Sequence, residues 1–184
     1  MLRLATSEAG FAKAFARLVA DRRESDDDVA RDVSLILGEV RQRGDDALAE
    51  YTARFDHYQL AAEADWLITA EQCRAACDAL DPELRAALEL AASRIRAYHE
   101  AQRPADRDAT DAAGVRLGAR WRAVDAAGLY VPGGRAAYPS SLLMNAIPAR
   151  VAGVDRLVVV TPTPHGQVNP LVLAAAHIAG VDEI

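Results

Sequence analysis

The sequence predicts an α/β fold, in which a mainly helical N-terminal part precedes the first strand–helix units of a parallel sheet. Apolar residues recur at helical spacing through the first hundred residues. Further along, the apolar run 129–131 ends at the Pro-Gly-Gly sequence of residues 132–134, and a helical pattern resumes after Pro139. Residues 156–160 (Arg-Leu-Val-Val-Val) form an uninterrupted run dominated by β-branched residues, which is typical of a parallel strand covered on both faces.

The composition excludes two classes of partner. Of the 184 residues, 51% are hydrophobic and 26% are charged, which suffices to bury a core. The net charge is -6 and no run is rich in Lys or Arg, so we expect neither nucleic acid nor an anionic membrane as the main partner. The N-terminus lacks the apolar core of a signal peptide, and no apolar run approaches the length of a membrane span. We therefore expect a cytoplasmic protein.

Residues 1–104 are predicted to be a mainly helical part that begins with three helices. Ser7 is placed to cap the first, and Ser25, followed by three aspartates, to start the second. Gly44 closes the second helix and Asp45 caps the third. Their apolar faces consist of Phe11, Phe15, Leu18 and Val19, then Val29, Val33, Ile36, Leu37 and Val40, then Leu48, Tyr51, Thr52 and Phe55.

Two more helices are expected in this part, after a short strand at residues 66–68. Thr69 and Gln72 have the spacing of a capping box, in which each side chain accepts a hydrogen bond from the other residue's backbone. Asp81, followed by Pro82 at the first helical position, starts the longest helix.

The second part, residues 115–184, is predicted to be the start of an incomplete Rossmann-like parallel sheet. Residues 105–114 lack apolar periodicity, and we interpret them as the connection between the two parts. Apolar and polar residues then alternate over residues 115–124, which predicts a strand pair or the edge of a hairpin.

The helix expected over about residues 141–151 contains Pro148, which predicts a kink or a break. After the apolar strand, residues 161–166 form a rigid, proline-rich loop. Asn169 then starts a helix that Gly180 closes.

Residues 181–184 have the pattern of an approach to a third strand. A sheet that stops at this point leaves its last element half formed. We therefore expect the natural polypeptide to continue beyond Ile184.

Cysteine and histidine show no metal-ligand spacing. Cys73 and Cys77 share one face of a helix, but no further Cys or His lies near them in the sequence, so we predict two reduced, buried thiols instead of a metal or redox pair. No catalytic role is assigned to any histidine: His57, His99, His165 or His177.

The strand–loop–helix around the Pro-Gly-Gly sequence is the candidate site. Ligands of open α/β sheets bind beyond the carboxyl ends of the strands, where Tyr130 is expected to lie. Gly133 and Gly134 let the backbone approach a ligand closely, and the free N–H groups of the following helix favour an anion such as phosphate. The alternative is that the two glycines only form a turn.

Residues 128–134 (GLYVPGG) and 138–154 (YPSSLLMNAIPARVAGV) closely resemble the NAD-binding region of the histidinol dehydrogenase family. The resemblance continues to the AGVDEI ending and, upstream, through residues 40–48 (VRQRGDDAL) and 51–56 (YTARFD). It covers nearly the whole chain.

This resemblance implies a zinc-dependent, usually homodimeric enzyme. The family oxidises L-histidinol to L-histidine, through the aldehyde, in two NAD-dependent steps of histidine biosynthesis. The family's tyrosine that contacts NAD corresponds to Tyr130. Pro132, Gly133 and Gly134 match the loop beside it and are expected to bind the cofactor as well.

The family's zinc ligands, its acid/base Glu-His pair and its other NAD contacts correspond to sequence past Ile184. We therefore assign no catalytic residue and no metal ligand to this chain, and we expect it to be the N-terminal part of such an enzyme, inactive alone. Two alternatives are a shortened relative that binds a nucleotide without chemistry and a dimerisation module whose helices pack against a partner subunit.

Overall fold

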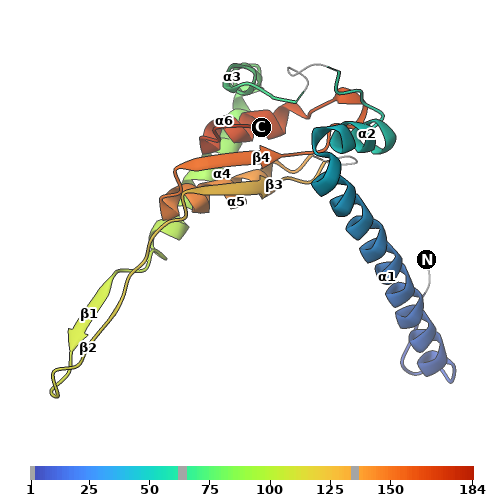
Figure 1. The fold of residues 1–184 in the computed structure, drawn as a ribbon, viewed down its shortest axis with the longest axis horizontal. Coiled ribbons are helices and arrows are strands. Elements are labelled where there is room, and N and C mark those ends of the chain that lie inside the picture. Colours follow the sequence, from blue (N-terminus) through green and yellow to red (C-terminus); the bar gives the residue numbers. More distant parts are fainter. Residues whose placement is uncertain (1–2, 62–65, 134–136) are drawn as a thin grey trace. The chain divides into compact units, whose positions relative to one another are not determined.

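The computed structural model describes residues 3–61, 66–133 and 137–184, except for the side chains of residues 21–27. The chain divides into two compact units, Met1–Tyr51 and Thr52–Ile184. Figure 1 labels the helices and strands. The labelled strands, and both cavities considered as ligand sites, belong to the second unit.

The first unit is built on one long helix, α1 (Phe11–Arg43). The prediction of two helices, the second starting at Ser25, was wrong. No Gly or Pro occurs between residues 11 and 37, so nothing interrupts the helical hydrogen bonds there. The predicted cap at Ser7 was also wrong, because Gly10 precedes the first turn and provides no side-chain cap.

The end of α1 agrees with the sequence. Gly44, at a φ of 60°, follows the last turn, and its N–H donates to the carbonyl of Val40. The left-handed region favours glycine, which explains the stop. Helix α2 (Asp45–Phe55) begins immediately, with Asp45 and Asp46 in its first turn, where negative charge is favourable.

The second unit contains the predicted parallel strands. Strand β3 (Ala126–Tyr130) pairs in parallel with β4 (Arg156–Val160), in a register that sets Tyr130 opposite Val160. Helix α5 (Pro139–Ala152) connects them, and α6 (Pro170–Ala179) follows β4. Glu183 makes an isolated parallel bridge to Val158, so the approach to a third strand is confirmed.

The core of this unit lies between the two strands and a layer of helices (Figure 1). Helix α5 packs against β3, α4 (Pro82–Glu100) and α6, while α6 also contacts α3 (Ala70–Asp78). The largest fully buried side chains are Leu142, Leu143, Ile147, Leu157, Val131, Val159 and Cys77. Burial of such aliphatic groups is the main stabilising contribution to the fold.

The predicted caps of α3 and α4 are both confirmed. Thr69 and Gln72 form the reciprocal capping box of α3, and the carboxylate of Asp81 accepts from two N–H groups at the start of α4. The short strand predicted at residues 66–68 is absent from the described part of that segment. Ile68 instead makes a single backbone hydrogen bond of 2.8 Å to Ile184, with no strand alongside to extend the pairing.

A two-stranded hairpin precedes the sheet. Strand β1 (Arg107–Thr110) pairs antiparallel with β2 (Arg116–Ala119), and every residue of both strands is exposed. The hairpin indicated by the alternation over residues 115–124 is therefore present. Its first strand falls within residues 105–114, which we interpreted as a connection. This strand was not predicted because β1 has no buried face and therefore no apolar pattern.

Helix α5 continues through Pro148 and ends at Gly153, whose φ is 94°. Of the kink or break predicted at Pro148, the break is not found, although the proline nitrogen cannot donate to the carbonyl four residues before it. Among the described residues, no helix combines the length and the hydrophobicity that crossing a membrane requires.

Candidate functional site

The loops after β3 and β4, together with the start of α6, enclose a cavity of about 420 Å³. This volume lies within the range of small-molecule sites, and its position beyond the carboxyl ends of parallel strands is the usual ligand position in open α/β sheets. Residues that line it include Pro132, Gly133, Thr161, Pro162, His165 and Asn169.

The predicted site residues have three different placements. Pro132 and Gly133 line the cavity. Tyr130, the last residue of β3, is 62% exposed and is not among the lining residues. Side chains alternate along β3, so Leu129 packs on the core while Tyr130 stands on the opposite face of the strand. Gly134 lies outside the described residues.

Gly133 is required for the close approach of two loops. A Cβ atom at this position would lie 3.0 Å from the carbonyl oxygen of Pro162 and 3.3 Å from its Cδ atom. Larger side chains would therefore push the loop after β3 away from the loop after β4. The glycine contributes to the cavity wall by allowing this contact.

Four lining residues carry polar side chains that were not predicted to bind a ligand: Thr161, His165, Gln167 and Asn169. The side chain of Asn169 accepts a hydrogen bond of 2.9 Å from the N–H of Leu171 and so caps α6, as expected from the Asn-Pro start. His165 adopts a φ of 57°, which is uncommon for a residue other than glycine. No local pattern signals this conformation, because its cause is a contact with a distant segment.

That distant segment directly follows α2. The N–H of His165 donates to the carbonyl of Asp56 at 2.6 Å, and the N–H of Thr163 donates to Oδ2 of the same residue at 3.1 Å. The imidazole rings of His57 and His165 are stacked, with centroids 5.5 Å apart. One side of the cavity is therefore held by residues about a hundred positions earlier in the chain.

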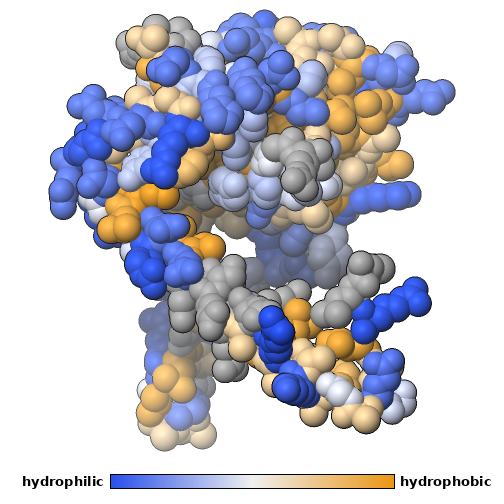
Figure 2. Space-filling model, turned by 90° about the vertical axis from the view of Figure 1, so that its right-hand side faces the viewer, coloured by the Kyte–Doolittle hydropathy of each residue, from blue (hydrophilic) through white to orange (hydrophobic). Residues whose placement is uncertain are grey.

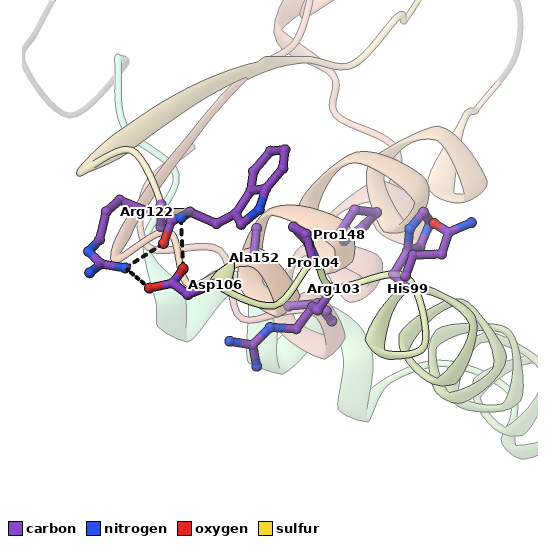
Figure 3. Close-up of a pocket in the computed structure, with 11 residues that line it drawn as sticks. His99, Arg103, Pro104, Asp106, Arg122, Pro148 and Ala152 are labelled. Carbon is purple, nitrogen blue, oxygen red and sulfur yellow. Dashed lines mark hydrogen bonds and ion pairs between the residues drawn. The ribbon is translucent and has the colours of Figure 1, made fainter. Parts of the chain in front are cut away.

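A second cavity, of about 560 Å³, lies among the end of α4, the base of the hairpin and α5 (Figure 3). Asp106 accepts from the N–H of Trp121 at 2.9 Å and from Arg122 at 3.2 Å, and these bonds lower the pKa of its carboxyl group. Ala123, just before β3, also lines this cavity, which places it at the amino ends of the strands. Because ligands of such sheets bind at the carboxyl ends, the smaller cavity is the candidate site.

The predicted burial of the two cysteine thiols is confirmed. Cys73 and Cys77 are free and buried, and burial raises the pKa of the Cys73 thiol because a thiolate is poorly solvated there. Within the described ranges, no group of three or more His, Cys, Asp or Glu residues is arranged to hold a metal ion.

The architecture and the position of the cavity define an α/β protein with a cavity at the carboxyl ends of parallel strands, where ligands of such sheets usually bind. The family model for histidinol dehydrogenase matches residues 19–184. The chain therefore belongs to the histidinol dehydrogenase family.

Individual relatives agree with this assignment. The chain is 59% identical to histidinol dehydrogenase from Zymomonas mobilis and 60% identical to that from Rhodospirillum rubrum, with all of this chain covered in each case. The crystal structure of histidinol dehydrogenase from Elizabethkingia anophelis has a TM-score of 0.75 and 28% identity over 84% of this chain, and the match covers 35% of that chain. The chain spans 43% and 42% of the length of the two curated relatives.

Proposed function

We propose that the natural protein carrying this chain is an L-histidinol dehydrogenase of histidine biosynthesis. It would oxidise L-histidinol to L-histidine through the aldehyde, with two NAD, in the cytoplasm. The observation that carries this proposal is the family match over residues 19–184, together with identities of 59% and 60% over the whole chain. Identity at this level supports a shared reaction as well as a shared fold.

We propose that NAD binds at the carboxyl ends of β3 and β4. When bound, NAD supplies the acceptor for the hydride that leaves the alcohol or the hydrated aldehyde. The cavity, of about 420 Å³, fits part of a dinucleotide, and it is bounded by Pro132 and Gly133 on one loop and by His165 on the other. Tyr130, exposed at the end of β3, is available to contact a ligand that extends over the strand end. Pro132 and Gly133 would contact the cofactor from the cavity wall, and Gly134 belongs to the same proposed loop.

Zinc is proposed as a cofactor of the complete enzyme and not of this chain alone. The described residues include no group of three or more His, Cys, Asp or Glu side chains that could hold a metal ion, and we assign no zinc ligand to this chain. The proton transfers of the reaction need a base that we assign to no residue of this chain. The role of this chain in the reaction is therefore to bind and orient the cofactor.

A homodimer is part of the proposal, and the surface of α1 supports it. Phe15, Val29, Val33 and Leu37 are each between 47% and 58% exposed on this helix. Figure 2 shows hydrophobic residues interspersed with hydrophilic ones over the face in view. Exposed apolar side chains at helical spacing are typical of surfaces that pack against a partner. The same observation favours the second candidate function, a dimerisation module without chemistry.

The test is the reaction of the natural gene product, purified with zinc and incubated with L-histidinol and NAD. We expect two NADH and one L-histidine per L-histidinol consumed, measured by absorbance and by chromatography. L-Histidine offered as the substrate is the control and should yield no NADH. A homogeneous, zinc-loaded protein that forms no NADH from L-histidinol would refute the proposal and leave the module as the better interpretation.

A further inference from the structure

Two histidines, of which His165 lines the cavity, have an unusual backbone conformation. His57 and His165, with φ values of 53° and 57°, are the positive-φ residues other than glycine in the described chain. Their rings stack on each other. A left-handed conformation at such residues costs free energy and persists only where surrounding contacts enforce it. The contacts around His57 and His165 therefore identify the residues that hold the loop after β4 in its conformation.

Asp56 provides the polar part of these contacts. It accepts two hydrogen bonds from the loop after β4, one through its backbone carbonyl and one through Oδ2. Both donors are backbone N–H groups, those of His165 and Thr163. Because a backbone conformation is held by the partners of its N–H groups, Asp56 determines the course of this loop at two points.

Tyr58 provides the apolar part. Gly166, at a φ of 71°, lies so close to the Tyr58 ring that a Cβ atom there would be 2.6 Å from Cε2. The aromatic ring thus covers the turn that Asp56 has bonded. Together, residues 56–58 contact the loop 163–166, whose other side lines the cavity through Pro164 and His165.

We infer that Asp56 is a positioning residue for cofactor binding. By fixing the loop 163–166, it holds one cavity wall in the conformation that receives the nicotinamide dinucleotide, without contacting the reacting atoms. This inference rests on the proposed function, since it takes NAD as the ligand of the cavity. Only the oxygen acceptor at Oδ2 is needed, because its partner is a neutral N–H group.

The first test compares Asp56→Ala with Asp56→Asn in the natural, zinc-loaded gene product. Alanine removes the side-chain acceptor, whereas asparagine retains an oxygen that can accept from Thr163. We expect D56A to raise the KM for NAD by about three- to tenfold, as the loss of one partly buried hydrogen bond implies, with kcat and the KM for L-histidinol changed less than about twofold. D56N should stay within about twofold of the wild type in all three constants.

The second test uses Gly166→Ala, with Gly114→Ala as its matched control. Both glycines have positive φ values, 71° and 83°, so alanine is strained at each position. Only Gly166 faces the Tyr58 ring, whereas a Cβ at Gly114 would meet nothing within 4 Å. We expect G166A to raise the KM for NAD and G114A to leave it unchanged.

Amide hydrogen exchange of residues 161–169 tests the loop without any turnover. Exchange should be faster in D56A and G166A, and unchanged in D56N and G114A. Unchanged exchange in D56A, or faster exchange with an unaltered KM for NAD, would overturn the inference. A wild-type protein that forms no NADH would refute the proposed function. It would refute the inference on Asp56 as well only if NAD also fails to slow amide exchange in this loop.

Discussion

Tyr130 is the residue whose proposed role can be separated from stability. Its side chain is 62% exposed at the end of β3, so its removal should leave the core intact. We expect Tyr130→Ala to raise the KM for NAD by about tenfold, the loss typical of one aromatic contact. The melting temperature should shift by less than about 3 °C, because exposed substitutions change stability by about 0.5 kcal/mol or less. Steady-state kinetics and a thermal scan measure the two effects.

Tyr98→Ala is the matched control for Tyr130→Ala. Tyr98 is 64% exposed on α4 and is absent from the lining of the candidate cavity. It should alter neither the KM for NAD nor the melting temperature appreciably. If Tyr130→Ala and Tyr98→Ala give the same kinetic constants, Tyr130 has no part in cofactor binding.

Among the elements, the end of α6 is tied to the sheet by a carboxylate. Oδ2 of Asp182 accepts from the N–H of Leu157 at 2.7 Å and from Arg150 of α5 at 2.6 Å. These interactions, the bond from Leu157 first, lower the pKa of Asp182. They thus hold residues 181–184 beside β4, where the third strand begins.

A carboxylate with a lowered pKa in the folded state stabilises the fold above its unfolded pKa, about 3.9 for aspartate. This stabilisation is lost as the pH falls through the lower, folded pKa. We expect Asp182→Asn to reduce the free energy of unfolding above about pH 5 by less than about 1 kcal/mol, since the pair is partly exposed. The difference from the wild type should shrink below about pH 3.9. Urea titrations at several pH values measure it.

Asp155→Asn is the control for this pH dependence, because Arg150 donates to the backbone carbonyl of Asp155, which the substitution retains. Its effect on the free energy of unfolding should be small at every pH. A difference between wild type and D182N that stays constant down to about pH 2, well below the unfolded pKa of aspartate, would show that the charge of Asp182 contributes nothing.

For the whole molecule, the 184-residue chain should bind cofactor weakly and catalyse nothing alone. Its relatives are more than twice as long, and the described residues line the proposed cofactor site but include no group of three or more His, Cys, Asp or Glu residues that could hold a metal ion. We expect no NADH from L-histidinol with this chain and added zinc, under conditions in which the natural gene product is active. Turnover by the 184-residue chain would contradict the proposal that its part in the reaction is limited to the cofactor.

Local patterns in the sequence determined the caps of α3, α4 and α6, the two parallel strands and the loop at Pro132 and Gly133. These features depend on hydrogen bonds and apolar spacing within a few residues, so they can be read directly. The break expected at Ser25 was wrong for a local reason, since an acidic run does not stop a helix that lacks Gly and Pro.

Only the tertiary structure decided how these elements form a site. Strand β1 forms because it pairs with β2. It has no apolar face, so its own residues do not predict a strand. His165 becomes a cavity residue because Asp56 and Tyr58, about a hundred positions earlier, hold its loop in a conformation that local propensity disfavours. The sequence by itself determined the family and the strand–loop–helix that carries Tyr130. The cavity wall formed by the loop 163–166 was decided by contacts with residues 56–58. These segments are distant in the sequence, so no local pattern encodes their contacts.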